Sequence, residues 1–195
     1  MKTKRFTVLA IGLILSLTAF AQPIEKKWGF EFNSGASFAT NKLADAQLKP
    51  GFGFEGLLHY RFMANLGIYG GWGWNKFTTD NSFAGSNTDF EETGYVFGLQ
   101  YTRPLGNSSH SWFLRGGGLY NHIELENSAG DIIHDSGHGL GWQAAGGLEI
   151  NLNAKWCLTP MVKFHSLSRN IEFEGSSKNM DLNYFSFRVG IARNF

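Results

Sequence analysis

Apolar and polar residues alternate along most of the chain. Within residues 52–62, for example, Phe54 and Tyr60 fall on one face of an extended backbone, whereas Glu55 and Arg61 fall on the other. A period of two residues predicts a β-strand. The same alternation recurs in 28–33, 66–75, 94–102, 140–152, 156–165 and 184–195, with a less regular segment at 112–122. The pattern therefore predicts eight strands of roughly ten residues each.

The connections between these predicted strands alternate between long and short. The long polar connections are 39–50, 78–89, 127–137 and 168–181, and the short ones are 63–65, 103–110 and 153–155. Tight turns at one rim and long loops at the other are typical of an up-and-down barrel. Pro160 falls inside the seventh predicted strand, where it cannot donate to the ladder, so we expect a local bulge there.

The charged residues gather on the polar face, which is also rich in glycine. They are Glu31, Glu55, Arg61, Arg115, Glu149, Lys163 and Arg188. Eight strands enclose just enough room for side chains, and isolated charges in such a space would be costly. We therefore predict that these residues form a mutually paired network in the lumen. Arg115 and Glu149 fall near the short-turn rim on neighbouring strands, and we expect them to form an ion pair.

Large aromatic residues occur near both ends of the predicted strands on the apolar face. At the short-turn rim these are Trp28, Tyr60, Phe62, Tyr101, Trp112, Trp156 and Phe195; at the long-loop rim they are Phe38, Phe52, Trp72, Trp74 and Tyr95. Two aromatic belts favour a barrel whose apolar face meets lipid. A soluble barrel with its apolar face inward is the alternative, and the Gly-rich, charged opposite face disfavours it.

The final segment, 184–195, resembles the C-terminal signal that outer-membrane barrels present to their assembly machinery, with Gly190, Ile191 and Phe195 in the characteristic positions. Arg193 departs from this signal, which usually has an aromatic residue there. Residues 22–195 as a whole are similar to the small outer-membrane β-barrel family, the OmpA/OmpX-like barrel domains.

This resemblance implies an all-β fold, an eight-stranded antiparallel up-and-down transmembrane β-barrel. It also implies a location in the outer membrane of a Gram-negative bacterium. The expected partners are outer-membrane lipid, lipopolysaccharide and, during biogenesis, the barrel assembly machinery.

Residues 1–21 differ from the rest of the chain and are typical of a secretory signal peptide. Lys2, Lys4 and Arg5 precede an apolar run over 6–17, and small residues frame a cleavage site after Ala21. The apolar run is shorter than the ~20 residues that a membrane-spanning helix needs, which disfavours an anchor. We expect one further domain, the barrel of residues 22–195.

Composition and net charge exclude several classes of protein. The 195 residues include 25 glycines, too many for a helical bundle, and one cysteine, which excludes an internal disulfide. The formal net charge of +1 comes without a basic run, so nucleic acid is not an expected partner.

Two local patterns suggest ligands. Residues 51–56 match the dinucleotide-binding fingerprint, but this motif works only where it opens a helix, and here it falls inside a predicted strand. His134, Asp135 and His138 could bind a metal, although their spacing in a predicted loop defines no geometry. We therefore expect no metal and no cofactor.

An enzyme is the remaining rival. Some small outer-membrane barrels remove acyl chains from lipid A with a His-x-Ser pair in a late strand, and this chain has His165, Ser166 and Ser168 at the corresponding place. Alternation puts both serines on the face opposite His165, so no catalytic residues are predicted. The preferred function is a non-enzymatic barrel with a filled lumen, presenting four surface loops and contributing to envelope integrity or surface interaction. A narrow solute channel and a lipid A-modifying enzyme stay as alternatives.

Overall fold

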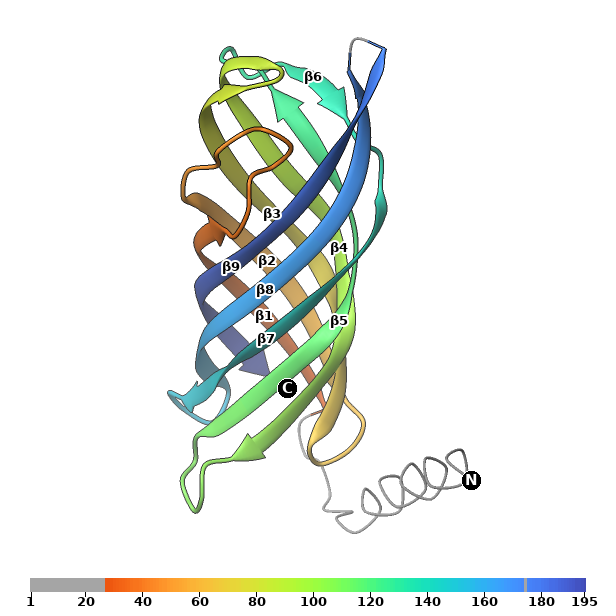
Figure 1. Ribbon diagram of the computed structural model, residues 1–195. Helices are drawn as coiled ribbons and strands as arrows, with labels where there is room; N and C mark the ends of the chain where they lie inside the picture. Colours follow the sequence, from red (N-terminus) through yellow and green to blue (C-terminus); the bar gives the residue numbers. More distant parts are fainter. Residues whose placement is uncertain (1–26, 174) are drawn as a thin grey trace, which may run out of the picture.

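The computed structural model describes residues 27–173 and 175–195, so the predicted signal peptide, residues 1–21, lies outside the described part. The described residues form nine strands joined by turns (Figure 1). The strands are β1 (Trp28–Ala39), β2 (Gly51–Arg61), β3 (Leu66–Ser82), β4 (Gly85–Pro104), β5 (Ser111–Glu126), β6 (Ile132–Asp135), β7 (Gly139–Asn151), β8 (Trp156–Phe173) and β9 (Ser176–Asn194). No helix in these ranges has the length and hydropathy to cross a membrane.

The strands close into a single barrel. Each pairs antiparallel with its neighbours, β1 pairs with both β2 and β9, and the pairing of β4 with β5 completes the ring. The short β6 pairs with the end of β5, while β7 pairs with the rest of β5, so β6 and β7 together follow one strand path. Eight strand paths therefore make the wall, which confirms the predicted antiparallel up-and-down barrel.

Several strands are longer than predicted, and two predicted loops are wrong. Segments 78–89 and 168–181 continue the β3–β4 and β8–β9 hairpins, in which β4 has 20 residues and β9 has 19. The physical reason is that alternation persists through both segments: Phe77 and Thr79 point inward on β3, as do Thr88 and Phe90 on β4. The predicted loop 127–137 contains β6. The connection after β1 runs outside strands from 40 to 50.

The bulge predicted at Pro160 is also wrong. Pro160 pairs with Val189 of β9 in an unbroken register. On its other side, the β7–β8 ladder skips the pairs around Pro160 between Gly147–Met161 and Ile150–Leu158, and the register is the same on both sides of the gap. The missing donor is therefore accommodated by a local interruption of the ladder.

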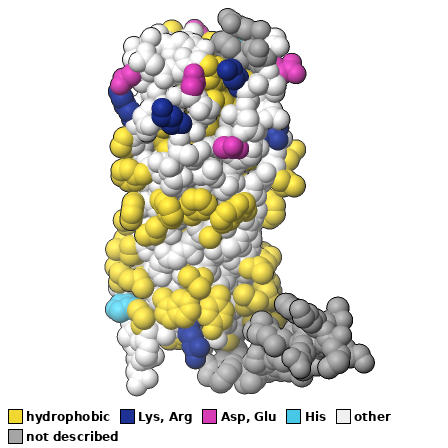
Figure 2. All heavy atoms as spheres, in the orientation of Figure 1, with side chains coloured by type: hydrophobic (Ala, Val, Ile, Leu, Met, Phe, Trp, Pro, Cys, Tyr) yellow, Lys and Arg dark blue, Asp and Glu magenta, His cyan; other side chains and the backbone are white. Residues whose placement is uncertain are grey.

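The outer wall carries the apolar residues of the alternation. Leu58, Phe187 and Val189 are each more than half exposed (56%, 58% and 55%). Figure 2 shows hydrophobic side chains in bands across the lower and middle wall on the face in view. In the short-turn belt the rings of Trp28 and Tyr60 lie 4.8 Å apart between centroids. So much exposed apolar surface indicates contact with lipid, which confirms the predicted orientation.

Above the aromatic belt of Phe38, Phe52, Trp72, Trp74 and Tyr95, which we call the long-hairpin belt, the amphipathic pattern is inverted. On β3 the outward positions change from Trp72 and Trp74 to Lys76, while the inward positions change from Asn75 to Phe77. The inward apolar residues form what we call the outer core: Leu43, Ala46, Leu48, Phe77, Phe90, Ile123, Leu125, Leu167, Ile171, Met180, Leu182 and Tyr184. The expectation that the lumen-facing side is polar throughout is therefore wrong for this end of the barrel.

The connection between β1 and β2 completes the outer core. Leu43 and Ala46, which form an isolated bridge, are 1% and 0% exposed. Hydrogen bonds fasten this connection to the two strands that flank the β1–β2 pair, because Thr40 N donates to Asn183 O (2.8 Å) on β9 and Lys49 N donates to Thr78 O (2.8 Å) on β3. Figure 1 shows the segment, in orange, against the upper part of the barrel.

Candidate functional site

The candidate site is the charged part of the lumen, between the outer core and the short-turn rim. Alternation directs side chains from every barrel strand toward this space. Six charged side chains lie there, each at most 7% exposed: Glu31, Glu55, Glu92, Arg115, Lys163 and Arg188. Carboxylates and cations are equal in number, as expected where unpaired charge would be costly.

Arg115 and Glu31 form the ion pair nearest the short-turn rim. The guanidinium binds the carboxylate in a bidentate manner, with Nη2–Oε2 and Nη1–Oε1 distances of 2.6 and 2.9 Å. The same guanidinium lies over the ring of Phe113, with Arg115 Cζ 4.4 Å from the ring centroid. A bidentate charge-assisted contact of this kind is among the stronger hydrogen-bonded arrangements in proteins. It spans the lumen from β5 to β1.

The predicted ion pair between Arg115 and Glu149 is not formed. Arg115 Nε donates instead to Gln100 Oε1 (2.7 Å), and Gln100 Nε2 donates to Glu149 Oε1 (2.9 Å). Glu149 lies 3.9 Å from the Arg61 guanidinium near the rim. The reason for the difference is that Glu31 reaches the guanidinium across the lumen, whereas the Glu149 carboxylate points toward the rim.

Glu55 is the centre of the next layer. Lys163 Nζ donates to both of its carboxylate oxygens, and Arg188 Nη1 lies 3.7 Å from Oε2. Asn33 connects this layer to the previous one, because its amide donates to Glu31 Oε1 (2.9 Å) and to Glu55 Oε2 (3.5 Å). The two layers are thus one hydrogen-bonded unit.

Glu92 anchors a third layer directly below the outer core. The Tyr184 hydroxyl donates to Glu92 Oε2 (2.7 Å), and the Asn121 amide donates to Oε1 (2.6 Å). His165 Nδ1 lies 2.7 Å from the same Tyr184 hydroxyl. Tyr184 belongs to the outer core as well, so its ring and its hydroxyl join the apolar and polar parts of the lumen.

The third layer was missed in reading the sequence. Glu92 stands beyond the segment assigned to the fourth strand, although it has the same parity as Gly94, Gly98 and Gln100 on the polar face. Extending the predicted strand by two residues toward the N-terminus would have placed Glu92 in the lumen. The seven predicted lumen residues all face inward, but Arg61 and Glu149 lie at the rim and are only partly buried.

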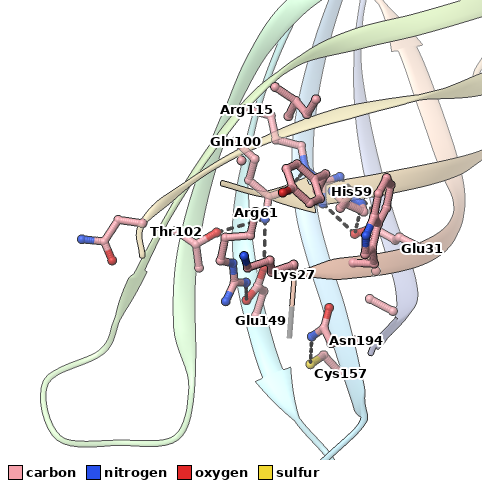
Figure 3. Close-up of a pocket in the computed structure, with 17 residues that line it drawn as sticks. Lys27, Glu31, His59, Arg61, Gln100, Thr102, Arg115, Glu149, Cys157 and Asn194 are labelled. Atoms are coloured by element: carbon pink, nitrogen blue, oxygen red, sulfur yellow. Dashed lines mark hydrogen bonds and ion pairs between the residues drawn. The ribbon is translucent and has the colours of Figure 1, made fainter. Parts of the chain in front are cut away.

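A small cavity of about 30 Å³ adjoins the Arg115–Glu31 pair (Figure 3). His59 lines it; its Nε2 lies 3.7 Å from Glu31 Oε2, and neither ring nitrogen has a hydrogen-bond partner in the protein. A space of this size holds a water molecule, which would satisfy such a group. A second hollow, of about 360 Å³, opens at the short-turn rim and is lined by Arg61, Glu149 and Lys155 among others.

The other sequence patterns occupy ordinary positions in the wall. Residues 51–56 lie in β2, away from any helix start in the described chain. His165 is 3% exposed inside the lumen, whereas Ser166 and Ser168 alternate to the outer face. The proposed assembly signal has Ile191 and Phe195 on the outer surface, 45% and 60% exposed. Its role stays a prediction.

A closed barrel with a lipid-facing apolar wall and a charged lumen defines an outer-membrane β-barrel protein. The comparisons agree with this class: the chain belongs to the family described as "Outer membrane protein beta-barrel domain", whose model matches residues 7–195. The protein is accordingly one of the outer membrane, where lipid and lipopolysaccharide surround its wall.

Solved structures share the fold at low sequence identity. Neisserial surface protein A is 12% identical, with 86% of this chain and 97% of that chain covered and a TM-score of 0.66. OprG of Pseudomonas aeruginosa is 14% identical, with 87% and 97% covered and a TM-score of 0.61. Outer Membrane Protein W of E. coli is 14% identical, with 88% and 100% covered and a TM-score of 0.55. A comparison with curated protein sequences found no match.

Proposed function

We propose that the protein is a non-enzymatic outer-membrane barrel with a closed lumen, which presents rigid hairpins at the surface and contributes to envelope integrity. The observation that carries this proposal is the succession of barriers along the lumen. An ion would have to pass the Arg115–Glu31 pair, the Glu55 layer, the Glu92 layer and then the outer core.

The outer core is the stronger barrier. Its buried members are hydrophobic side chains, and Phe77 and Phe90 are both 0% exposed. Apolar constrictions exclude ions because water leaves them. Eight strands also leave an interior that side chains fill. These points favour a structural role over the narrow solute channel.

The arrangement of the rims supports a surface role. Outer-membrane barrels have short turns on the periplasmic side and longer connections on the extracellular side. In that orientation the outer core and its hairpins stand outside the membrane, available to surface partners. Assembly through the 184–195 signal and a mature domain of residues 22–195 belong to the same proposal.

Planar-bilayer recording tests the closed lumen. We expect the purified protein to insert without unit conductance steps. A conducting porin inserted into the same bilayers serves as the positive control. Steady unit conductance from the unmodified protein would establish the channel instead.

Mass spectrometry of lipid A tests the non-enzymatic part. Cells expressing the protein should have the same lipid A acylation as cells with the empty vector. Loss of an acyl chain that depends on His165 would show an enzyme.

A further inference from the structure

The outer wall above the long-hairpin belt contains an unusual row of acidic residues. Cross-strand pairing sets Glu91 of β4 opposite Glu124 of β5, and Glu124 opposite Asp135 of β6. Like charges directly opposite each other destabilise a sheet unless a cation lies between them. A cation beside each of the two acidic pairs, Glu91–Glu124 and Glu124–Asp135, would therefore stabilise the sheet.

Lysine supplies that charge at one end of the row. Lys76 Nζ lies 2.9 Å from Asp89, 2.9 Å from Glu91 and 2.8 Å from Glu126. One lysine thus serves three carboxylates. Glu124 and Asp135 both form their ion pairs in this patch with a histidine, His122.

His122, Glu124 and Asp135 point their ligand atoms at one place. His122 Nδ1 lies 2.9 Å from Asp135 Oδ1 and 3.7 Å from Glu124 Oε1, and one ligand atom from each residue falls within 4.8 Å of the others. In a tetrahedral zinc site with bonds of ~2.0–2.2 Å, ligand atoms stand about 3.3 Å apart. To reach that geometry, the longest edge of this triangle, at most 4.8 Å, shortens by up to about 1.5 Å, and the 2.9 Å edge lengthens by about 0.4 Å.

The surroundings hold the three residues in place. The His122 ring stacks on the His138 ring, with centroids 4.2 Å apart and an interplanar angle of 19°. Gly137 N donates to Asp135 Oδ1 (2.7 Å), so the carboxylate is fixed on the His122 side. The His122 and Glu124 side chains are only 12% and 19% exposed, whereas Asp135 is 47% exposed and leaves the site open to solvent.

Glu124 and its acidic cross-strand neighbours Glu91 and Asp135 lie beyond the aromatic belt, outside the membrane-spanning part of the wall.

We propose that His122, Glu124 and Asp135 form a surface binding site for a divalent transition-metal ion, of which Zn²⁺ is the representative. The mixed set of one imidazole and two carboxylates selects zinc over Mg²⁺ and Ca²⁺, which take oxygen ligands. The Nδ1 proton now donated to Asp135 moves to Nε2 or to water when the metal binds. Of His134, Asp135 and His138, the metal candidates suggested by the sequence, Asp135 belongs to this site. Its other two ligands, His122 and Glu124, come from β5.

Calorimetry on the full barrel in detergent micelles, produced with a tag free of histidine, tests the site. ZnCl₂ should bind with one site per chain, and MgCl₂ at the same concentration should not compete. His122→Ala and Asp135→Asn should each weaken zinc binding by at least about tenfold. His134→Ala is the matched control, because it lies on the same short strand next to Asp135 and alternates to the other face, and it should leave zinc binding unchanged.

Cobalt gives a second readout. Co²⁺ bound at the site should produce a visible absorption spectrum that disappears in His122→Ala and is displaced by equimolar Zn²⁺. A heat-modifiable shift on gels verifies that each variant is folded. The proposal is overturned if zinc binding is absent, if Mg²⁺ displaces it equally well, or if His134→Ala weakens it as much as His122→Ala does.

Discussion

Replacing Arg115 by methionine tests whether the charged lumen stabilises the barrel. The substitution keeps an apolar stem against Phe113 but removes both hydrogen bonds to Glu31, whose side chain is 1% exposed. Asn33 would be the remaining hydrogen-bond donor that the structure places on that carboxylate. Leaving one member of a buried ion pair unpartnered costs about 3–5 kcal/mol. We expect the lower value, about 3 kcal/mol, because the adjoining cavity can admit water to the carboxylate.

A double-mutant cycle gives the decisive number. Glu31→Met alone should also cost about 3 kcal/mol, since it strands the guanidinium. The double variant should cost about 3 kcal/mol or less, because no charge is left unpaired, which corresponds to a coupling of about 3 kcal/mol.

Urea unfolding in lipid vesicles, followed by the fluorescence of the six tryptophans, measures each free energy. Arg103→Met, an exposed arginine at the end of β4, is the control and should change stability by less than about 0.5 kcal/mol. Additive losses of about 6 kcal/mol in the double variant, or single losses below about 1 kcal/mol, would refute the reasoning.

Three further predictions concern the wall and the third lumen layer. Gly117→Val should abolish the heat-modifiable form on gels, because a Cβ there would overlap the backbone of β4, whereas Gly116→Ala, with open space around its Cβ, should leave that form intact. Val189→Arg, on the lipid face midway between the belts, should lower the unfolding free energy in vesicles by about 2–4 kcal/mol, and a loss no greater than that of Val189→Ala would contradict the lipid-facing assignment. Tyr184→Phe removes a buried hydroxyl with two partners and should cost about 1–3 kcal/mol in the same assay; an unchanged midpoint would show that these hydrogen bonds are dispensable.

Much of the fold could be predicted from the chain because a strand has only two faces. Assigning Phe54 outward and Glu55 inward requires local alternation alone, and the structure confirms both the alternation and its orientation toward lipid. The same alternation places the aromatic residues near the strand ends on the outward face, where they form the two belts. Strand ends were harder to predict, because Thr and Asn residues typical of loops also continue the hairpins beyond the membrane.

The lumen contacts could not be predicted in the same way. Whether Arg115 reaches Glu31 or Glu149 depends on the stagger of strands around the ring, which joins residues 84 positions apart. The outer core escaped prediction for a related reason. Phe77 and Leu167 have the parity of lumen residues, but the solvent outside the wall changes from lipid to water at that height, and this change is not visible in the alternation.

The inversion of the wall above the belt has a practical consequence for engineering. A peptide tag inserted at 42–48 or along the extended hairpins would break an apolar centre and compromise the whole end of the barrel. The turn at 128–130, between β5 and β6, is exposed and contributes no residue to the outer core, so an epitope placed there should be displayed on living cells without disturbing what lies beneath.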